Sequence, residues 1–148
     1  MAAPILLVED EPDDVYFLKR AFTSTSVTAP IVVLADGGAA IDYLAGTGAF
    51  SNRDEHPLPA LMLLDLKLPG VTGFDVLAWL RAQPGLKRLP VIVLTSSSQD
   101  EDVRRAYDLG VNSYLVKPSG LKAIADVAQQ IERYWLNMNR RPDIRDVR

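Results

Sequence analysis

The residues of this sequence that could carry out chemistry stand at the ends of short apolar runs. They comprise three acids, one hydroxyl and one ammonium, namely Glu9, Asp10, Asp65, Thr95 and Lys117. A buried carboxylate without a partner is costly. Three carboxylates close together repel one another unless a cation lies among them or one of them holds a proton. If the apolar runs lie side by side, their ends therefore predict an acidic cluster that needs a cation.

This set of groups is suited to the transfer of a phosphoryl group to a carboxylate. Asp65 would be the nucleophile and would form an aspartyl phosphate. Carboxylate oxygens with few other protein ligands suit Mg²⁺, which keeps several of its waters. Mg²⁺ and Lys117 would neutralise the charge of the transferring group, and the Thr95 hydroxyl can donate a hydrogen bond to a phosphate oxygen.

The apolar runs themselves predict buried strands. Residues 61–64 are four consecutive apolar residues bounded by prolines, which is typical of a strand covered on both faces. Four similar runs occupy residues 4–8, 31–34, 90–94 and 114–116. Apolar residues at helical spacing predict five helices that begin near residues 12, 37, 72, 98 and 119.

Strands that alternate with helices predict an α/β fold with a parallel sheet. Right-handed crossovers then place helices on both faces of the sheet. Ligands of such sheets bind outside the carboxyl ends of the strands, which is where the five polar residues stand. We expect a single domain.

Several boundaries follow from local patterns. Thr72 to Asp75 and Ser98 to Glu101 each predict a capping box at a helix start. The connector at residues 46–59 exceeds the usual length of a loop, so it is either ordered for a purpose or simply tolerated. The last helix should end by Met138, which leaves residues 139–148 as a polar, solvated tail.

Composition excludes several classes of protein. The chain has 148 residues, a net charge of −3 and no cysteine, which argues against nucleic-acid binding, disulfides, thiol catalysis and zinc sites built on cysteine. No signal peptide is evident, and no segment approaches the roughly 20 apolar residues of a membrane span. We expect a cytoplasmic protein that does not interact with membranes.

Taken together, the motifs resemble the receiver domain of two-component response regulators. The resemblance spans nearly the whole chain, and its motifs are Leu6-Leu7-Val8-Glu9-Asp10, Leu64-Asp65-Leu66-Lys67-Leu68-Pro69, Gly73, Leu94-Thr95-Ser96 and Lys117-Pro118. It implies a flavodoxin-like (CheY-like), doubly wound sheet of strand order 2-1-3-4-5. Residues 1–138 would form the receiver domain, with no output domain after it.

The resemblance also implies roles for individual residues. Asp65 would accept a phosphoryl group from a sensor histidine kinase, while Glu9, Asp10, Asp65 and the carbonyl of Lys67 would hold Mg²⁺. Thr95 and Tyr114 occupy the places of the switch hydroxyl and the switch aromatic, and the Lys117–Pro118 bond is expected to be cis. The protein would be a phosphoacceptor and not an enzyme, apart from its own phosphotransfer and dephosphorylation.

A narrower resemblance concerns the stand-alone receivers that work with phytochrome-type sensor kinases. It depends on the long loop before the third strand and on the ending Ile131-Glu132-Arg133-Tyr134-Trp135-Leu136. It implies a bacteriophytochrome as the kinase and a homodimer through the surface of the fourth helix, fifth strand and fifth helix. The output would be contact with another protein.

Three other functions compete with this interpretation. A hydrolase of the haloacid dehalogenase class normally has a second acid two residues after its aspartyl nucleophile, where this chain has Lys67. A flavin carrier would need a phosphate-binding loop after the first strand, but Glu9-Asp10-Glu11-Pro12 would repel a phosphate. A receiver that binds its partner without phosphorylation would not need the complete acidic set.

Other polar residues have simpler explanations. His56, the only histidine, is expected to be a surface residue of the long loop. Asp13, Asp14 and the acids at 100–102 are favourable charges at helix starts. Tyr114 could equally be a half-buried strand aromatic. Lys67 and Ser97 stand where the family tunes dephosphorylation, so the lifetime of the phosphorylated state stays open.

Overall fold

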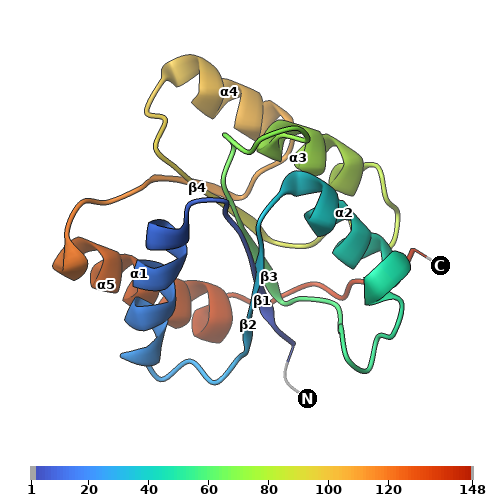
Figure 1. Cartoon of the computed structure of the whole chain (residues 1–148), viewed down its shortest axis with the longest axis horizontal. Coiled ribbons are helices and arrows are strands. Elements are labelled where there is room, and N and C mark those ends of the chain that lie inside the picture. The colour runs from blue at the N-terminus through green and yellow to red at the C-terminus, as the bar shows by residue number, and fades with distance from the viewer. Residues whose placement is uncertain (1–2, 148) are drawn as a thin grey trace.

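Five short strands pair in parallel and form one sheet, which lies between two layers of helices (Figure 1). The computed structural model describes residues 3–147. The strands are β1 (Ile5–Val8), β2 (Ile31–Leu34), β3 (Leu61–Leu64), β4 (Val91–Thr95) and β5 (Ser113–Val116). Their order is β2-β1-β3-β4-β5, so the predicted doubly wound topology is confirmed. The strand order reverses between β1 and β3, and a crevice is expected at that point.

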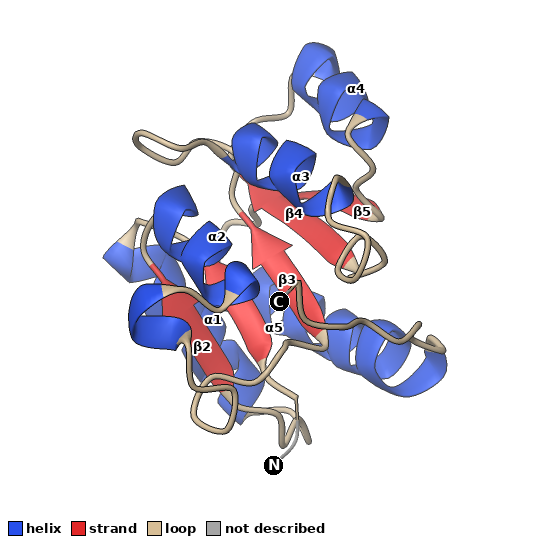
Figure 2. Cartoon of the chain, turned by 90° about the vertical axis from the view of Figure 1, so that its right-hand side faces the viewer, coloured by secondary structure: helices blue, strands red, loops and turns tan. Residues whose placement is uncertain are grey.

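Five helices connect and follow the strands, as predicted. They are α1 (Pro12–Thr23), α2 (Gly37–Ala45), α3 (Gly73–Arg81), α4 (Asp100–Asp108) and α5 (Leu121–Gln130). Helix α5 continues directly as the π-helix η2 (Ile131–Met138), so the helical segment ends at the predicted residue. Figure 2 shows the strands with helices on both faces of the sheet.

Alternate residues of the central strands face two separate cores. Leu6 and Val8 of β1 pack with α2 and α3, whereas Ile5 and Leu7 pack with α1 and α5. Every residue of β1, β3 and β4 is buried, while the edge strands β2 and β5 are largely half-buried. This burial on both faces explains why the central strands are continuous apolar runs.

The structure confirms one of the two predicted capping boxes. Thr72 accepts a hydrogen bond of 3.2 Å from the Asp75 N–H, and Asp75 accepts one of 3.0 Å from the Thr72 N–H. The prediction for Ser98 is wrong, because α4 begins after Gln99 and that residue has no side-chain cap. The serine that does bond to this turn is Ser97, which accepts a hydrogen bond of 3.3 Å from the Gln99 N–H.

Two details near β5 also differ from expectation. Every peptide bond within residues 3–147 is trans, so the expected cis bond between Lys117 and Pro118 is wrong. The trans isomer is the intrinsically favoured one, by about 0.5–1 kcal/mol for a bond to proline. Helix α5 begins at Leu121, two residues after the predicted Ser119, because Gly120 has a φ of 91°, which no helix continues.

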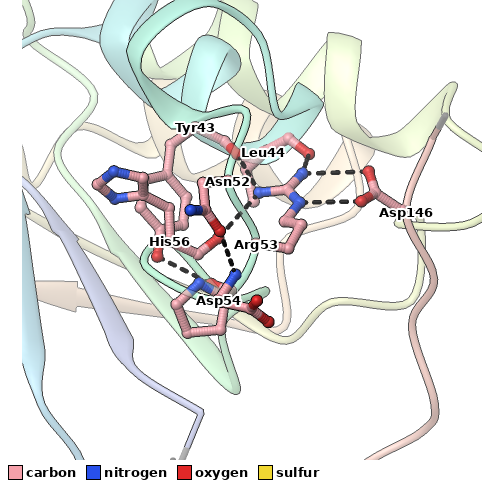
Figure 3. Close-up of polar contacts among 8 residues, drawn as sticks. Tyr43, Leu44, Asn52, Arg53, Asp54, His56 and Asp146 are labelled. Atoms are coloured by element: carbon pink, nitrogen blue, oxygen red, sulfur yellow. Dashed lines mark hydrogen bonds and ion pairs between the residues drawn. The ribbon is translucent and has the colours of Figure 1, made fainter.

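The long connector before β3 is ordered. It contains the short 3₁₀ helix η1 (Gly48–Phe50), and Arg53 donates hydrogen bonds of 2.7 and 2.8 Å to the carbonyls of Tyr43 and Leu44 at the end of α2 (Figure 3). The His56 ring is half-buried and packs edge-on against Tyr43 and Phe50. His56 is therefore part of the packing of the connector and not simply a surface residue.

The segment after η2 has no regular structure, but it is attached to the rest of the molecule. Asp146 pairs with Arg53, whose Nε lies 2.9 Å from Oδ2 (Figure 3). The Arg145 N–H donates a bond of 2.7 Å to the carbonyl of Gly85, where a β-carbon would lie only 2.6 Å from the Arg145 carbonyl oxygen. Ile144 packs against the core. In residues 3–147, none of the helices combines the length and the apolar character that crossing a bilayer requires.

Candidate functional site

The polar residues singled out in the sequence meet at the carboxyl edge of the sheet. Backbone hydrogen bonds extend the strand pairing to them: the Asp65 N–H donates to the Val8 carbonyl at 3.0 Å, and the Lys117 N–H donates to the Thr95 carbonyl at 2.7 Å. The parallel register therefore sets Glu9 beside Asp65, and Lys117 directly follows Val116, the register partner of Thr95. Asp65 stands at the point where the strand order reverses.

Lys117 is the central cation of this site. Its Nζ lies 2.7 Å from Oε1 of Glu9, 3.0 Å from Oδ2 of Asp65 and 2.8 Å from Oδ2 of Asp14. Burial disfavours the ammonium, but hydrogen bonds to these three carboxylates outweigh it and raise the pKa of Lys117 above its ordinary value. The ammonium therefore stays charged at neutral pH.

Asp65 is buried and accepts hydrogen bonds on both oxygens. Its Oδ1 accepts from the Thr95 hydroxyl at 2.8 Å and from the Lys67 N–H at 3.2 Å, and its Oδ2 faces Lys117. Burial opposes ionisation, but the bonds from Lys117 and Thr95 outweigh it and lower the pKa of Asp65. The carboxylate is thus ionised at neutral pH, the form that a nucleophile requires.

The other buried acid, Glu9, is less easily ionised. Burial raises the pKa of Glu9 to about 7, and the nearby charge of Asp65 adds to the effect. The hydrogen bonds from Lys117 and from the Glu11 N–H do not offset this fully. The two buried acids have one ammonium between them, so a further cation would stabilise both in their charged forms.

The geometry of the acidic cluster fits a divalent cation. Glu9, Asp10 and Asp65 each offer a carboxylate oxygen, and these three atoms lie within 4.8 Å of one another. An all-carboxylate set of this size suits a hard cation that keeps several waters. The carbonyl of Lys67, the fourth expected ligand, stays a prediction.

Asp14 belongs to this cluster, although its charge alone suggested only a favourable helix start. It lies in the first turn of α1, and its bond to Lys117 joins residues 103 positions apart. Its neighbour Asp13 is exposed, as a simple helix-start charge should be. The one signal in the sequence is that Asp14 is part of the acidic stretch that begins at Glu9.

Tyr114 and the residues after β4 form a second group beside the site. The Tyr114 hydroxyl donates a hydrogen bond of 2.9 Å to the carbonyl of Ser97, and burial raises the pKa of Tyr114. The Ser97 hydroxyl donates to Oδ2 of Asp102 at 2.5 Å, and Lys67 Nζ lies 3.2 Å from the same oxygen. Asp102, read from the sequence as a helix-start charge, thus has two side-chain partners.

Comparison with known proteins agrees with this site. Residues 5–129 match the family model of the response regulator receiver domain. The probable methanogenesis regulatory protein FilR2 of Methanothrix harundinacea is 42% identical over 138 residues, which are 93% of this chain and 86% of that protein. Response regulator Rcp1 of Synechocystis sp. is 41% identical over 132 residues, which are 89% of this chain and 88% of Rcp1.

Solved structures give the same result. The crystal structure of the phosphorylated cyanobacterial phytochrome response regulator RcpA is 36% identical, with a TM-score of 0.89 over 97% of this chain and 100% of RcpA. The crystal structure of the Mn²⁺-bound form of Rcp1 is 38% identical, with a TM-score of 0.86 over 95% of this chain and 99% of that one. The chain therefore belongs to the family of response regulator receiver domains.

Proposed function

We propose that this receiver domain is a phosphorylation-dependent switch that accepts a phosphoryl group on Asp65 from a sensor histidine kinase. The observation that carries the proposal is the environment of the Asp65 carboxylate. It is ionised, it stands where the strand order reverses, and it has donors on both sides, Lys117 at 3.0 Å and Thr95 at 2.8 Å. Donors placed in this way stabilise the charge that develops on a transferring phosphoryl group.

In the proposed transfer, a carboxylate oxygen of Asp65 attacks the phosphorus of a phosphohistidine. The new O–P bond forms as the P–N bond breaks, and the imidazole, which carries a proton on its other ring nitrogen, leaves as a neutral group with the bonding electron pair. Lys117 and Thr95 then donate their hydrogen bonds to oxygens of the phosphoryl group. Mg²⁺, held by Glu9, Asp10, Asp65 and the carbonyl of Lys67, would neutralise part of the phosphoryl charge.

The similarity to RcpA and Rcp1 supports a kinase of the phytochrome type as the partner. The residue two positions after Asp65 supports a signalling function and argues against a hydrolase. This residue, Lys67, supplies an ammonium that pairs with Asp102, and not the second acid of a hydrolase. Thr95 and Tyr114 would act as the switch pair, and output would be contact with another protein.

A homodimer through α4, β5 and α5 is part of this proposal. Large apolar side chains are exposed on these elements, namely Tyr107 at 50%, Val116 at 46% and Leu121 at 59%. Exposed apolar residues that gather on one surface favour a protein interface. A mass in light scattering that stays monomeric over a wide concentration range would contradict the dimer without affecting the chemistry.

The test of the phosphoryl transfer uses a small phosphodonor, acetyl phosphate. Wild type and Asp65→Asn are incubated with it, with and without Mg²⁺, and resolved on a phosphate-affinity gel. Asp126→Asn, which changes an exposed aspartate of α5, is the matched control. We expect a Mg²⁺-dependent shift in the wild type and the control that is absent in Asp65→Asn. A shift that persists in Asp65→Asn would identify a different nucleophile.

A further inference from the structure

Helix α4 is attached to the rest of the molecule by few apolar contacts. Within α4, all of whose residues the structure describes, Ala106 is the only buried residue. Figure 1 shows α4 at the outer end of the layer that it shares with α3. An element with so little buried apolar surface is easily displaced, so its polar contacts matter for its position.

The polar contacts at the start of α4 converge on Asp102. This side chain accepts a hydrogen bond of 2.5 Å from the Ser97 hydroxyl and pairs with Lys67, whose Nζ lies 3.2 Å away. One carboxylate thus connects the first turn of α4 to the loop after β4 and to the loop after β3. The hydrogen bond from Ser97 lowers the pKa of Asp102, so the group is charged at neutral pH.

Lys67 connects the same carboxylate to Asp65. Its backbone N–H donates to Oδ1 of Asp65 at 3.2 Å, while its side-chain ammonium reaches Asp102. The side chain of Lys67 is 57% exposed, so its ammonium can change partner without disturbing the core. A phosphoryl group on Asp65 would carry about 1.5–2 negative charges next to this residue, in place of the single charge of the carboxylate.

We propose that Asp102 is a positioning residue that holds α4 through its ion pair with Lys67, and that a phosphoryl group on Asp65 weakens this pair by competing for the Lys67 ammonium. The release step rests on the proposed function, whereas the ion pair in the unphosphorylated protein does not. We call the contacts of Asp102 with Lys67 and Ser97 the tether of α4. The carbonyl of Ser97 also accepts the hydrogen bond of the Tyr114 hydroxyl. Release at Asp102 would therefore loosen the contact that holds the Tyr114 hydroxyl.

The size of the effect follows from the exposure of the pair. Ion pairs with one exposed partner contribute little, and their loss corresponds to a change of about 1.5- to 5-fold in an equilibrium. A contact that favours the unphosphorylated arrangement shifts the balance of states by no more than this factor. When the ion pair is lost, we expect the equilibrium constant for opening of the start of α4 to rise by the same factor.

The test is amide hydrogen exchange at the start of α4, in a double-mutant cycle. Asp102→Asn keeps an oxygen that can accept the Ser97 hydrogen bond and removes only the charge, and Lys67→Met removes only the ammonium. Asp100→Asn is the matched control, because it removes an exposed acid from the same turn. Both aspartate variants lose a favourable charge at the helix start, so only the pair distinguishes them.

We expect exchange of the amides of residues 103 and 104 to be about 1.5- to 5-fold faster in Asp102→Asn than in Asp100→Asn, and faster by the same factor in Lys67→Met than in the wild type. The double variant should be no faster than the faster single variant, because both substitutions break the same contact. Wild-type protein phosphorylated on Asp65 should show the same acceleration. Additive effects, or equal exchange in Asp102→Asn and Asp100→Asn, would overturn the tether itself. Phosphorylation without acceleration would overturn only its release, and failure to phosphorylate Asp65 would overturn release together with the proposed function.

Discussion

The hydroxyl group of Thr95 donates a hydrogen bond of 2.8 Å to Oδ1 of Asp65, and both side chains are buried. The carboxylate is therefore stabilised from β4 through Thr95 and from the end of β5 through Lys117. The two donors approach different oxygens of the same group. The negative charge of Asp65 is thus stabilised by hydrogen-bond donors from two neighbouring strand ends.

Replacement of Thr95 by Val should show what this bond contributes. The substitution removes the hydroxyl but nearly keeps the volume of the side chain. We expect the free energy of unfolding at pH 7 to fall by about 1.5 kcal/mol, because a buried carboxylate loses a hydrogen bond. Thr95→Ser keeps the hydroxyl and should retain most of the stability. Urea denaturation measures both variants, and a Thr95→Val protein as stable as the wild type would contradict the role given to this bond.

Replacement of Lys117 by Met should make the acidic cluster depend on a metal ion. Glu9 and Asp65 would remain buried without their shared ammonium, and breaking a buried pair in this way costs about 3 kcal/mol. For a chain of this length, such a loss lowers the melting temperature by about 6–12 °C. A divalent cation would offset the repulsion that remains. We therefore expect Mg²⁺ to raise the melting temperature more in Lys117→Met than in the wild type.

The matched control for Lys117→Met is Lys122→Met, which removes an exposed lysine of α5. Its melting temperature should respond to Mg²⁺ as the wild type does. Thermal unfolding of the three proteins, with Mg²⁺ and with a chelator, gives the comparison. An equal response to Mg²⁺ in Lys117→Met and Lys122→Met would argue against a cation site at these carboxylates.

Asp75 should give the protein a stability that disappears in acid. The hydrogen bond from the Thr72 N–H lowers the pKa of Asp75 in the folded state. The unfolded pKa is about 3.9, so the contribution is complete above that pH and is lost as the pH falls through the lower folded value. Wild type should therefore be more stable than Asp75→Asn at pH 7, and the difference should shrink below about pH 4.

Urea denaturation of wild type and Asp75→Asn over a series of pH values measures this difference. Asp126→Asn, which changes an exposed aspartate of α5, is the control and should follow the wild type throughout. A difference between wild type and Asp75→Asn that stays constant as the pH falls would be inconsistent with the low pKa of Asp75.

The strand ends of this protein could be predicted from its sequence because they follow from local patterns. Runs such as Leu61–Leu64 are apolar throughout since both of their faces are covered, and a parallel sheet brings all carboxyl ends to one edge. That was sufficient to place Asp65, Thr95 and Lys117 together. The capping box at Thr72 is equally local and was predicted for the same reason.

The contacts that were missed depend on how helices pack on the sheet. The sequence shows Asp14 and Asp102 as acids in the first turn of a helix, which is correct for both. It does not show that α1 directs Asp14 at Lys117, or that α4 directs Asp102 at Lys67. These bonds join a helix to a loop that is distant in the chain, and neither residue type nor spacing encodes them. The pairing of Arg53 with Asp146 is of the same kind.

The pair of Arg53 and Asp146 should fix the end of the chain to the long connector. Asp146→Asn removes the charge, and we expect the free energy of unfolding to fall by no more than about 1 kcal/mol, because the pair is partly exposed. The larger effect should be local. The Arg145 amide, which donates to the Gly85 carbonyl at 2.7 Å, should exchange its hydrogen faster in the variant. Asp143→Asn changes an exposed acid three residues earlier and should leave this exchange unaltered. If the Arg145 amide exchanges equally fast in both variants, Ile144 and the backbone bond hold this segment without help from Arg53.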